Sequence, residues 1–179
     1  MKYGVIIPNL MINNKPAPYA VVNERKVRGS AGIMFLVGVI TFATVFFTKN
    51  YTPLYIVVPI FWLDFFLKTV FQPHFSIFGR ISHLMVKNQE PEYVGAIQKR
   101  FAWGIGLALA SIMLISAVFL GIRGPLPFTI CTICLFFMWL ESAFGICVGC
   151  SIYSYLIKKG LIKKPDIKPS CPGNVCSID

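Results

Sequence analysis

Four long apolar stretches are the feature that most constrains how this chain can fold. A helix needs about 20 predominantly apolar residues to cross the hydrocarbon core of a bilayer. Strands of a membrane barrel are instead about ten residues long and alternate in polarity, which these continuous stretches do not. The sequence therefore predicts an all-α fold, an integral membrane four-helix bundle. The spans are expected at about residues 30–48, 52–67, 101–122 and 127–157.

The placement of the basic residues predicts the orientation of these spans. Only 13% of the residues are charged, yet the formal net charge is +10. Fifteen of the 17 Lys and Arg residues lie before the first stretch, between the second and third, or in the tail. The other two, Lys49 and Arg123, lie in the remaining connections. Because Lys and Arg accumulate on the cytoplasmic side, we expect a multi-pass membrane protein with both termini cytoplasmic.

The same pattern divides the chain into three parts. We expect a cytoplasmic segment at residues 1–29, a membrane domain at 30–160 and a cytoplasmic Cys-containing tail at 161–179. Topology and contact with a lipid bilayer that carries anionic headgroups account for the positive charge, so no nucleic-acid partner is expected. Residues 74–87 have apolar side chains at helical spacing and are predicted to form an amphipathic helix at the cytoplasmic interface.

All six cysteines form close pairs in the last third of the chain. The pairs are Cys131 and Cys134 in CTIC, Cys147 and Cys150 in CVGC, and Cys171 and Cys176 in CPGNVC. A spacing of three puts both sulfurs on one helical face, where they can form a disulfide or share a ligand. Small residues also let membrane helices pack closely, so packing is the alternative interpretation. A cytoplasmic location otherwise leaves thiol redox chemistry, sulfur transfer, or metal binding by Cys147, Cys150, Cys171 and Cys176.

Distances along the fourth stretch limit how these pairs can cooperate. On one helix Cys134 and Cys147 are about 20 Å apart, too far for direct attack of a thiolate on a sulfur. Beyond Cys150 the helix is expected to continue to Gly160. The ten residues that follow can reach back about 30 Å. The tail cysteines are therefore predicted to meet the CVGC pair on the cytoplasmic side.

Two acidic residues fall within the apolar stretches. Asp64 precedes Lys68 by four residues, which predicts a local ion pair. Glu141 has no basic residue within reach on its own helix, and ionisable groups inside membranes are by default functional candidates. We expect Glu141 either to accept a proton or to pair with a group from another helix. No Walker loop, dinucleotide-binding glycine pattern or c-type haem motif occurs, so no cofactor is expected.

Four sequence segments carry a resemblance to a known family. They are VNERKVRGSAG, DFFLKTVFQPHFSIFGRIS, QKRFAWGIG and LESAFGICVGCSIYSYLIKKGLI. Over about residues 20–162 the chain resembles a bacterial family of small membrane proteins, domain of unknown function 4395. The resemblance implies a four-helix protein of the bacterial inner membrane with Glu141, Cys147 and Cys150 as motif residues. It also implies a loose link to sulfur or thiol metabolism. The CTIC pair and the CPGNVC tail depart from the family pattern.

The leading hypothesis is a membrane thiol protein. Cys147 and Cys150 would pass electrons or sulfur to a thioredoxin- or rhodanese-like cytoplasmic protein, or accompany passage of a small sulfur compound. Glu141 would accept a proton or tether two helices, and the other cysteine pairs would be auxiliary. One alternative is a structural subunit of a larger membrane complex, and another is a Cys-based metal-binding membrane protein. The pattern assigns no enzymatic activity.

Overall fold

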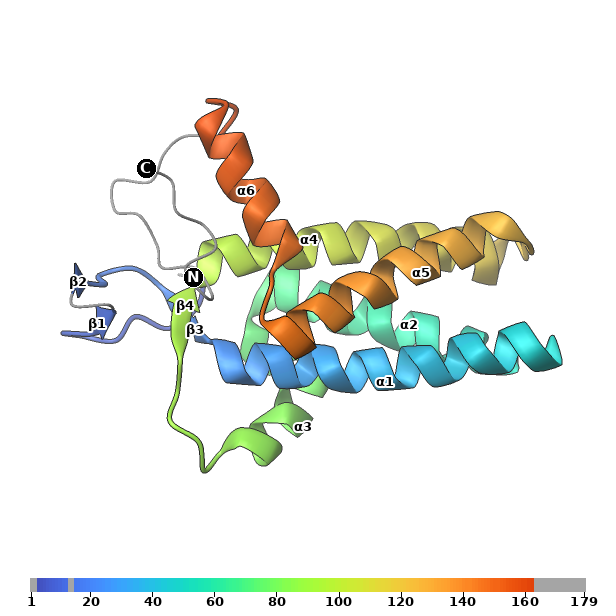
Figure 1. Cartoon of the computed structure of the whole chain (residues 1–179), viewed down its shortest axis with the longest axis horizontal. Coiled ribbons are helices and arrows are strands. Elements are labelled where there is room, and N and C mark those ends of the chain that lie inside the picture. Colours follow the sequence, from blue (N-terminus) through green and yellow to red (C-terminus); the bar gives the residue numbers. More distant parts are fainter. Residues whose placement is uncertain (1–2, 13–14, 163–179) are drawn as a thin grey trace.

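Four long helices run side by side along the length of the molecule. The computed structural model describes residues 3–12 and 15–162 (Figure 1). The helices are α1 (Glu24–Thr48), α2 (Thr52–Phe66), α4 (Ala96–Met113) and α5 (Pro125–Trp139). The last three continue into π-helical turns at Leu67–Phe71, Leu114–Phe119 and Leu140–Phe144. With these turns all four are long and apolar enough to cross a membrane, which confirms the predicted all-α four-helix fold.

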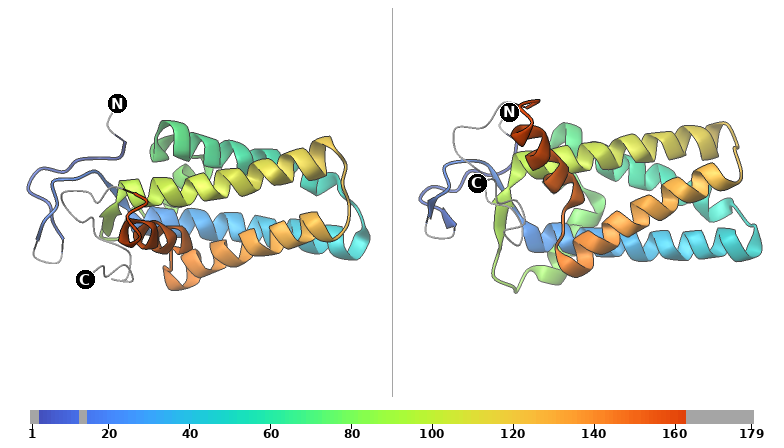
Figure 2. Two further views of the ribbon diagram at one scale, coloured as in Figure 1. Left: turned by 90° about the horizontal axis from the view of Figure 1, so that it is seen from above. Right: turned by 45° about the horizontal axis from the view of Figure 1, so that its top comes forward.

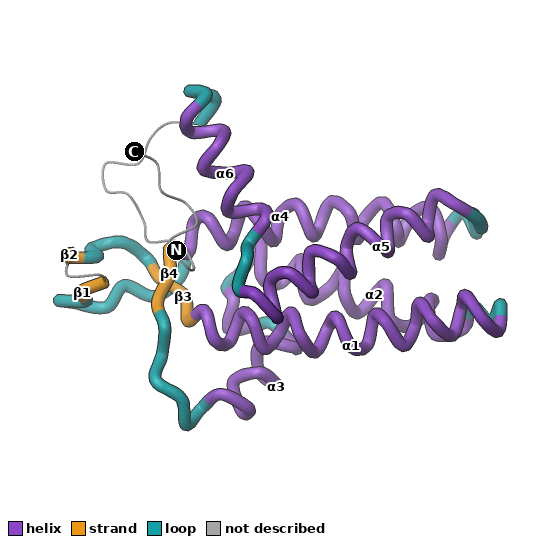
Figure 3. Tube along the Cα trace, in the orientation of Figure 1, coloured by secondary structure: helices purple, strands orange, loops and turns teal. Residues whose placement is uncertain are grey.

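The remaining elements gather at one end of the bundle (Figures 1, 2 and 3). They are a 3-10 turn (Pro73–Phe75), α3 (Ile77–Val86), α6 (Val148–Lys158) and two antiparallel two-stranded sheets, β1 (Met11–Ile12) with β2 (Lys15–Pro16) and β3 (Val21–Asn23) with β4 (Tyr93–Gly95). At the opposite end, short loops join α1 to α2 and the third span to α5 (Figure 2). These two loops contain Lys49 and Arg123.

The bundle is apolar on its outside as well as in its core. Large side chains such as Phe47 and Phe119 are exposed on the outer surface of the helices. Met34, Phe78 and Met138 are buried together where α1, α3 and α5 meet. Outward apolar side chains are typical of helices that face lipid, where there is no water to drive them inward.

The β3–β4 ribbon aligns the starts of α1 and α4. Val22 pairs with Val94, and each helix begins directly after its strand. Asn23 caps α1, since its side-chain oxygen accepts a hydrogen bond of 3.0 Å from the N–H of Arg25. The ribbon therefore brings Glu24, the first residue of α1, close to Lys99 in the first turn of α4.

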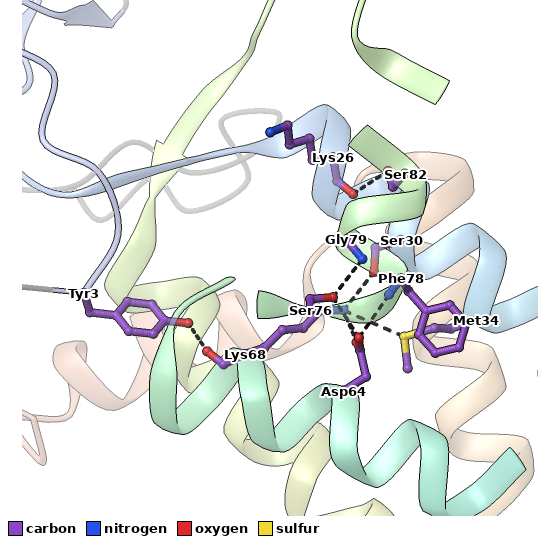
Figure 4. A network of polar contacts seen from close by, with 10 residues as sticks. All are labelled: Tyr3, Lys26, Ser30, Met34, Asp64, Lys68, Ser76, Phe78, Gly79 and Ser82. Carbon is purple, nitrogen blue, oxygen red and sulfur yellow. Dashed lines mark hydrogen bonds and ion pairs between the residues drawn. The ribbon is translucent and has the colours of Figure 1, made fainter. Parts of the chain in front are cut away.

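A buried polar network joins α2 to α1 and α3 (Figure 4). The predicted ion pair is confirmed, with Lys68 Nζ lying 2.7 Å from Asp64 Oδ2. Lys68 also donates to Ser30 Oγ on α1 at 2.8 Å. The other carboxylate oxygen of Asp64 accepts hydrogen bonds from Ser76 Oγ at 2.8 Å and from the N–H of Phe78 at 3.1 Å. Asp64 thus holds the start of α3 against the bundle.

The prediction of one helix spanning residues 127–157 is wrong. The fourth span ends at Phe144, and α6 begins at Val148 as a separate helix that leaves the bundle (Figures 1 and 3). Gly145 terminates the span because it adopts a left-handed conformation, with φ of 69°. Its N–H donates to the carbonyl of Glu141, and the N–H of Ile146 donates to that of Leu140, each at 3.1 Å. The amphipathic helix predicted at 74–87 is α3, which is shorter.

Candidate functional site

The CVGC pair lies at the break between the fourth span and α6. Cys147 caps the N-terminus of α6 and Cys150 lies in its first turn. The two residues form a disulfide, with their Cα atoms 5.2 Å apart. The N–H of Cys150 donates to Cys147 Sγ at 3.3 Å. The N–H of Cys150 has no carbonyl partner within the helix and points to one sulfur of the pair. N–H groups at a helix start stabilise a thiolate that lies in front of them.

The disulfide is covered by the contact between α6 and α4. Cys147 is 6% exposed and Cys150 only 1%, and both pack against Ala102 of α4. Gly149 permits this contact, because a Cβ atom there would lie 2.5 Å from the Cβ of Ala102. Burial also raises the pKa of the Tyr153 hydroxyl, one turn further along α6. Of the two cysteines, Cys147 is the more exposed.

A buried three-residue charge cluster lies beside the break. Lys99 is fully buried, and its Nζ lies 2.8 Å from Glu141 Oε1 and 2.9 Å from Glu24 Oε2. Of the two uses expected for Glu141, pairing with a group from another helix is confirmed. The cluster connects α1, α4 and the π-helical turn that precedes Gly145.

Arg28 of α1 closes the C-terminal end of the fourth span. Its Nη2 donates to the carbonyls of Ser142 and Ala143, each at 3.3 Å. A Cβ atom at Gly145 would lie 3.4 Å from the guanidinium carbon. A cation at the carbonyl end of a helix is stabilising because the helix dipole is negative there. Arg28 and Lys99 together fix the turn that leads into Cys147.

An apolar cavity of about 160 Å³ extends through the bundle and reaches the CVGC pair. Side chains of α1, α2, α4 and α5 form its walls. Glu141, Cys147, Val148 and Gly149 line it at the end nearest α6. Cys150 does not line it, so the disulfide presents Cys147 to the cavity.

The other predicted cysteines are placed differently. Cys131 and Cys134 are free thiols on α5 that line the same cavity, and they pack near Met113 and Ile130. Cys171 and Cys176 lie outside the described residues, as does the predicted meeting of the tail with the CVGC pair. Within residues 3–12 and 15–162, no three His, Cys, Asp or Glu side chains cluster closely enough to hold a metal ion.

Sequence reasoning missed three residues of the site. Arg28 and Lys99 contribute to the sequence prediction only as charges that indicate orientation, and Glu24 only as part of the segment VNERKVRGSAG. An indirect signal was available, because Glu141 requires a buried cation and Lys99 lies at the start of the neighbouring third span. The β3–β4 ribbon that aligns Glu24 with Lys99 has strands of only three residues each, too short to identify from alternation.

Comparison with known proteins bears on the family and not on the activity. No curated protein and no solved structure matches the chain. The family described as domain of unknown function (DUF4395) matches residues 22–158, which include all four spans, the charge cluster and the CVGC pair. The chain therefore belongs to the DUF4395 family.

Proposed function

We propose that this protein is a membrane thiol–disulfide exchange protein. Cys147 and Cys150 cycle between the disulfide and the dithiol, and a thioredoxin- or rhodanese-like cytoplasmic protein is the soluble partner. The observation that carries the proposal is the disulfide at a helix start, where the N–H of Cys150 points to Cys147 Sγ at 3.3 Å. Pairs in this position act in disulfide oxidoreductases because the helix start stabilises the attacking thiolate.

The exchange chemistry assigns different roles to the two sulfurs. A thiolate of the partner attacks Cys147 Sγ, the S–S bond breaks, and Cys150 Sγ leaves as a thiolate. In a thioredoxin-like partner, which has two thiols, the second thiolate then attacks the partner sulfur that is bound to Cys147 and releases Cys147 as a thiolate. The partner becomes a disulfide and the CVGC pair a dithiol. Cys147 is assigned the attacked position because it is the more exposed of the two cysteines and borders the cavity.

The burial of the pair means that α6 must move before a protein partner can reach it. Gly145 ends the span in a conformation that separates α6 from α5, so α6 can shift without disturbing the fourth span. The contact to be broken is the packing of Gly149 and Tyr153 against Ala102 and Phe101 of α4.

We infer that the CVGC end of the bundle faces the cytoplasm, in the bacterial inner membrane. The starts of α1 and α4 and all of α3 and α6 lie at this end, and they contain most of the described Lys and Arg residues. Lys68 and Lys99 are buried in ion pairs, so their charges do not contribute to the comparison of the two ends. The remaining basic residues still favour this end over the end with Lys49 and Arg123.

A second candidate function is a structural subunit of a larger membrane complex. The close contact of Gly149 with Ala102 favours this function, because small residues allow membrane helices to pack closely. In that case the disulfide would hold the first turn of α6 in shape and would not cycle.

Thiol labelling in intact and broken cells separates these functions. We expect Cys147 and Cys150 to become labelled from the cytoplasmic side only after treatment with a membrane-permeant reductant. Cys147→Ser/Cys150→Ser removes this signal, and Cys131→Ser/Cys134→Ser, which alters a pair of the same spacing, leaves it unchanged. A pair that never changes state favours the structural function. Persulfide trapped on Cys147 indicates sulfur transfer, and zinc lost in the first double variant indicates metal binding.

A further inference from the structure

We infer that the cavity behind Cys147 binds the ring of a lipid-soluble quinone, which exchanges two electrons with the CVGC pair. The inference rests on the proposed thiol–disulfide function and names its second redox partner. A soluble dithiol exchanges with the pair from the water side, and the quinone exchanges with it from the membrane side. The pair lies at the boundary between the two environments, at the end of the fourth span.

The size and lining of the cavity support a ring of this kind. Its volume is about 160 Å³. An apolar protein cavity of about 150 Å³ holds a benzene molecule, so the volume is of the order of a single six-membered ring. The walls include the aromatic side chains of Phe61 and Phe65 of α2. Rings of this type pack well against a flat apolar ligand.

The cavity is much less suited to an anionic sulfur compound. Its walls are mostly apolar, and its ionisable groups near Cys147 include the carboxylate of Glu141. Bringing an anion out of water to the Cys147 end is strongly unfavourable. Among the described residues the basic side chain that lines the cavity is Arg123, which lies in the loop at the opposite end of the bundle. Lys99 is already paired with two carboxylates, and Arg28 is bonded to two carbonyls. A neutral carrier that partitions into lipid meets no such barrier.

The geometry at the end of the cavity matches what a quinone needs. The cysteine of the pair that borders the cavity is Cys147, and Cys150 is buried against α4. Glu141 is, among the residues that the structure describes, the only carboxylate on the cavity wall. Oxidation of a dithiol releases two protons, and reduction of a quinone takes up two. Glu141 is placed to pass a proton between the thiol and a carbonyl oxygen of the ring.

The reaction balances without a further reactant. The two thiols lose two electrons and two protons as the S–S bond forms. The quinone gains them, and its two carbonyl oxygens become the hydroxyls of the hydroquinone. The soluble dithiol then reduces the disulfide again by the exchange described above. The overall result is transfer of two electrons and two protons from a soluble dithiol to the quinone.

The test uses the purified full-length chain in lipid nanodiscs, with its other four cysteines replaced by serine. The pair is reduced with a soluble dithiol, the reductant is removed, and a short-tailed ubiquinone is added. Its ring is fully substituted, so thiols cannot add to it. We expect one quinone reduced per chain, followed by its absorbance, together with the loss of both free thiols. A pair that cycles with the soluble dithiol but leaves the quinone oxidised overturns the quinone inference alone. A pair that the dithiol cannot reduce overturns the proposed function.

Two matched substitutions test whether the cavity is the site. Val148→Phe fills the cavity next to Cys147. Val39→Phe makes the same change on the outer surface of α1, where Val39 is 37% exposed and outside the cavity lining. We expect Val148→Phe to slow quinone reduction about tenfold or more, and Val39→Phe to leave it unchanged. Equal rates in the two variants overturn the inference.

A binding measurement on the unsubstituted protein covers the case in which Val148→Phe does not fold. A photoreactive ubiquinone is irradiated with the oxidised protein, and the labelled peptides are identified by mass spectrometry. Labelling of the peptide that contains Cys147 and Val148, competed by unlabelled ubiquinone, supports the inference. Labelling confined to the outer surface of the helices contradicts it.

Discussion

Gly149→Ala tests whether the packing of α6 on α4 controls access to the disulfide. A Cβ atom added at Gly149 would lie 2.5 Å from the Cβ and 2.6 Å from the Cα of Ala102. The second of these atoms is backbone, so the clash cannot be relieved by turning a side chain. We expect α6 to move away from α4 and to expose the CVGC pair.

The size of the effect follows from the overlap. Ordinary carbon contacts begin at about 3.5 Å, so the new methyl group overlaps Ala102 by roughly 1 Å. Inserting a methyl group into a well-packed site typically costs about 1–3 kcal/mol. If the disulfide reacts only when α6 has moved away, the rate of reduction by a small soluble thiol rises by the corresponding factor, about 5- to 150-fold.

The assay compares Gly149→Ala with Gly104→Ala. Gly104 lies on α4, and a Cβ atom there would meet only Thr69 Cγ2, at the ordinary distance of 4.0 Å. We expect Gly104→Ala to leave the reduction rate unchanged and the melting temperature equal or slightly higher, since Ala is favoured over Gly in a helix. Free thiols are quantified over time after addition of the reductant. Equal rates for Gly149→Ala and the unsubstituted protein would refute the argument that burial limits the reaction.

Three further predictions concern the residues that hold the site. Lys99→Met leaves two buried carboxylates without their cation, so we expect a loss of about 3–5 kcal/mol in thermal unfolding, and a smaller loss for Glu141→Gln; equal losses would contradict the shared-cation arrangement. Asp64→Ala removes the oxygen that accepts hydrogen bonds from Ser76 Oγ and from the N–H of Phe78, so hydrogen exchange should accelerate in α3, and unchanged exchange there would count against it. Gly145→Ala and Gly121→Ala each place a side chain at positive φ, at a cost of about 1–2 kcal/mol. A Cβ atom at Gly145 would meet the Arg28 guanidinium at an ordinary contact distance of 3.4 Å, and one at Gly121 would meet nothing within 4 Å. We therefore expect similar drops in unfolding temperature, and an unchanged temperature for Gly145→Ala would be contrary evidence.

The membrane spans could be predicted from sequence because each depends on one property of a continuous stretch. Apolar length alone identified all four helices. The ion pair of Asp64 and Lys68 was equally accessible, since four residues separate neighbours on a helix face. These features require no knowledge of how the helices are arranged.

The features that escaped prediction depend on contacts between distant segments. Lys99 pairs with Glu141 across 42 residues and with Glu24 across 75. Helical periodicity relates residues three or four positions apart and cannot reveal contacts at such separations. The end of the fourth span was also missed, because the apolar sequence continues through Gly145 although the helix ends there. A glycine within an apolar run indicates a helix end only when the groups that close it, here Arg28 and the carbonyls beside it, are known.

The two Cys-x-x-Cys pairs show why the spacing alone could not identify the site. Cys131 and Cys134 have the same separation as Cys147 and Cys150, lie in the same apolar region of the sequence and border the same cavity. The first pair lies within α5, where the backbone N–H groups are bonded to carbonyls of the preceding turn. The second pair lies at the start of α6, where the N–H of Cys150 has no such carbonyl and bonds to a sulfur. Only the second pair has a donor that can stabilise a thiolate, so the helix break at Gly145 is what makes one of two identical spacings a candidate for chemistry.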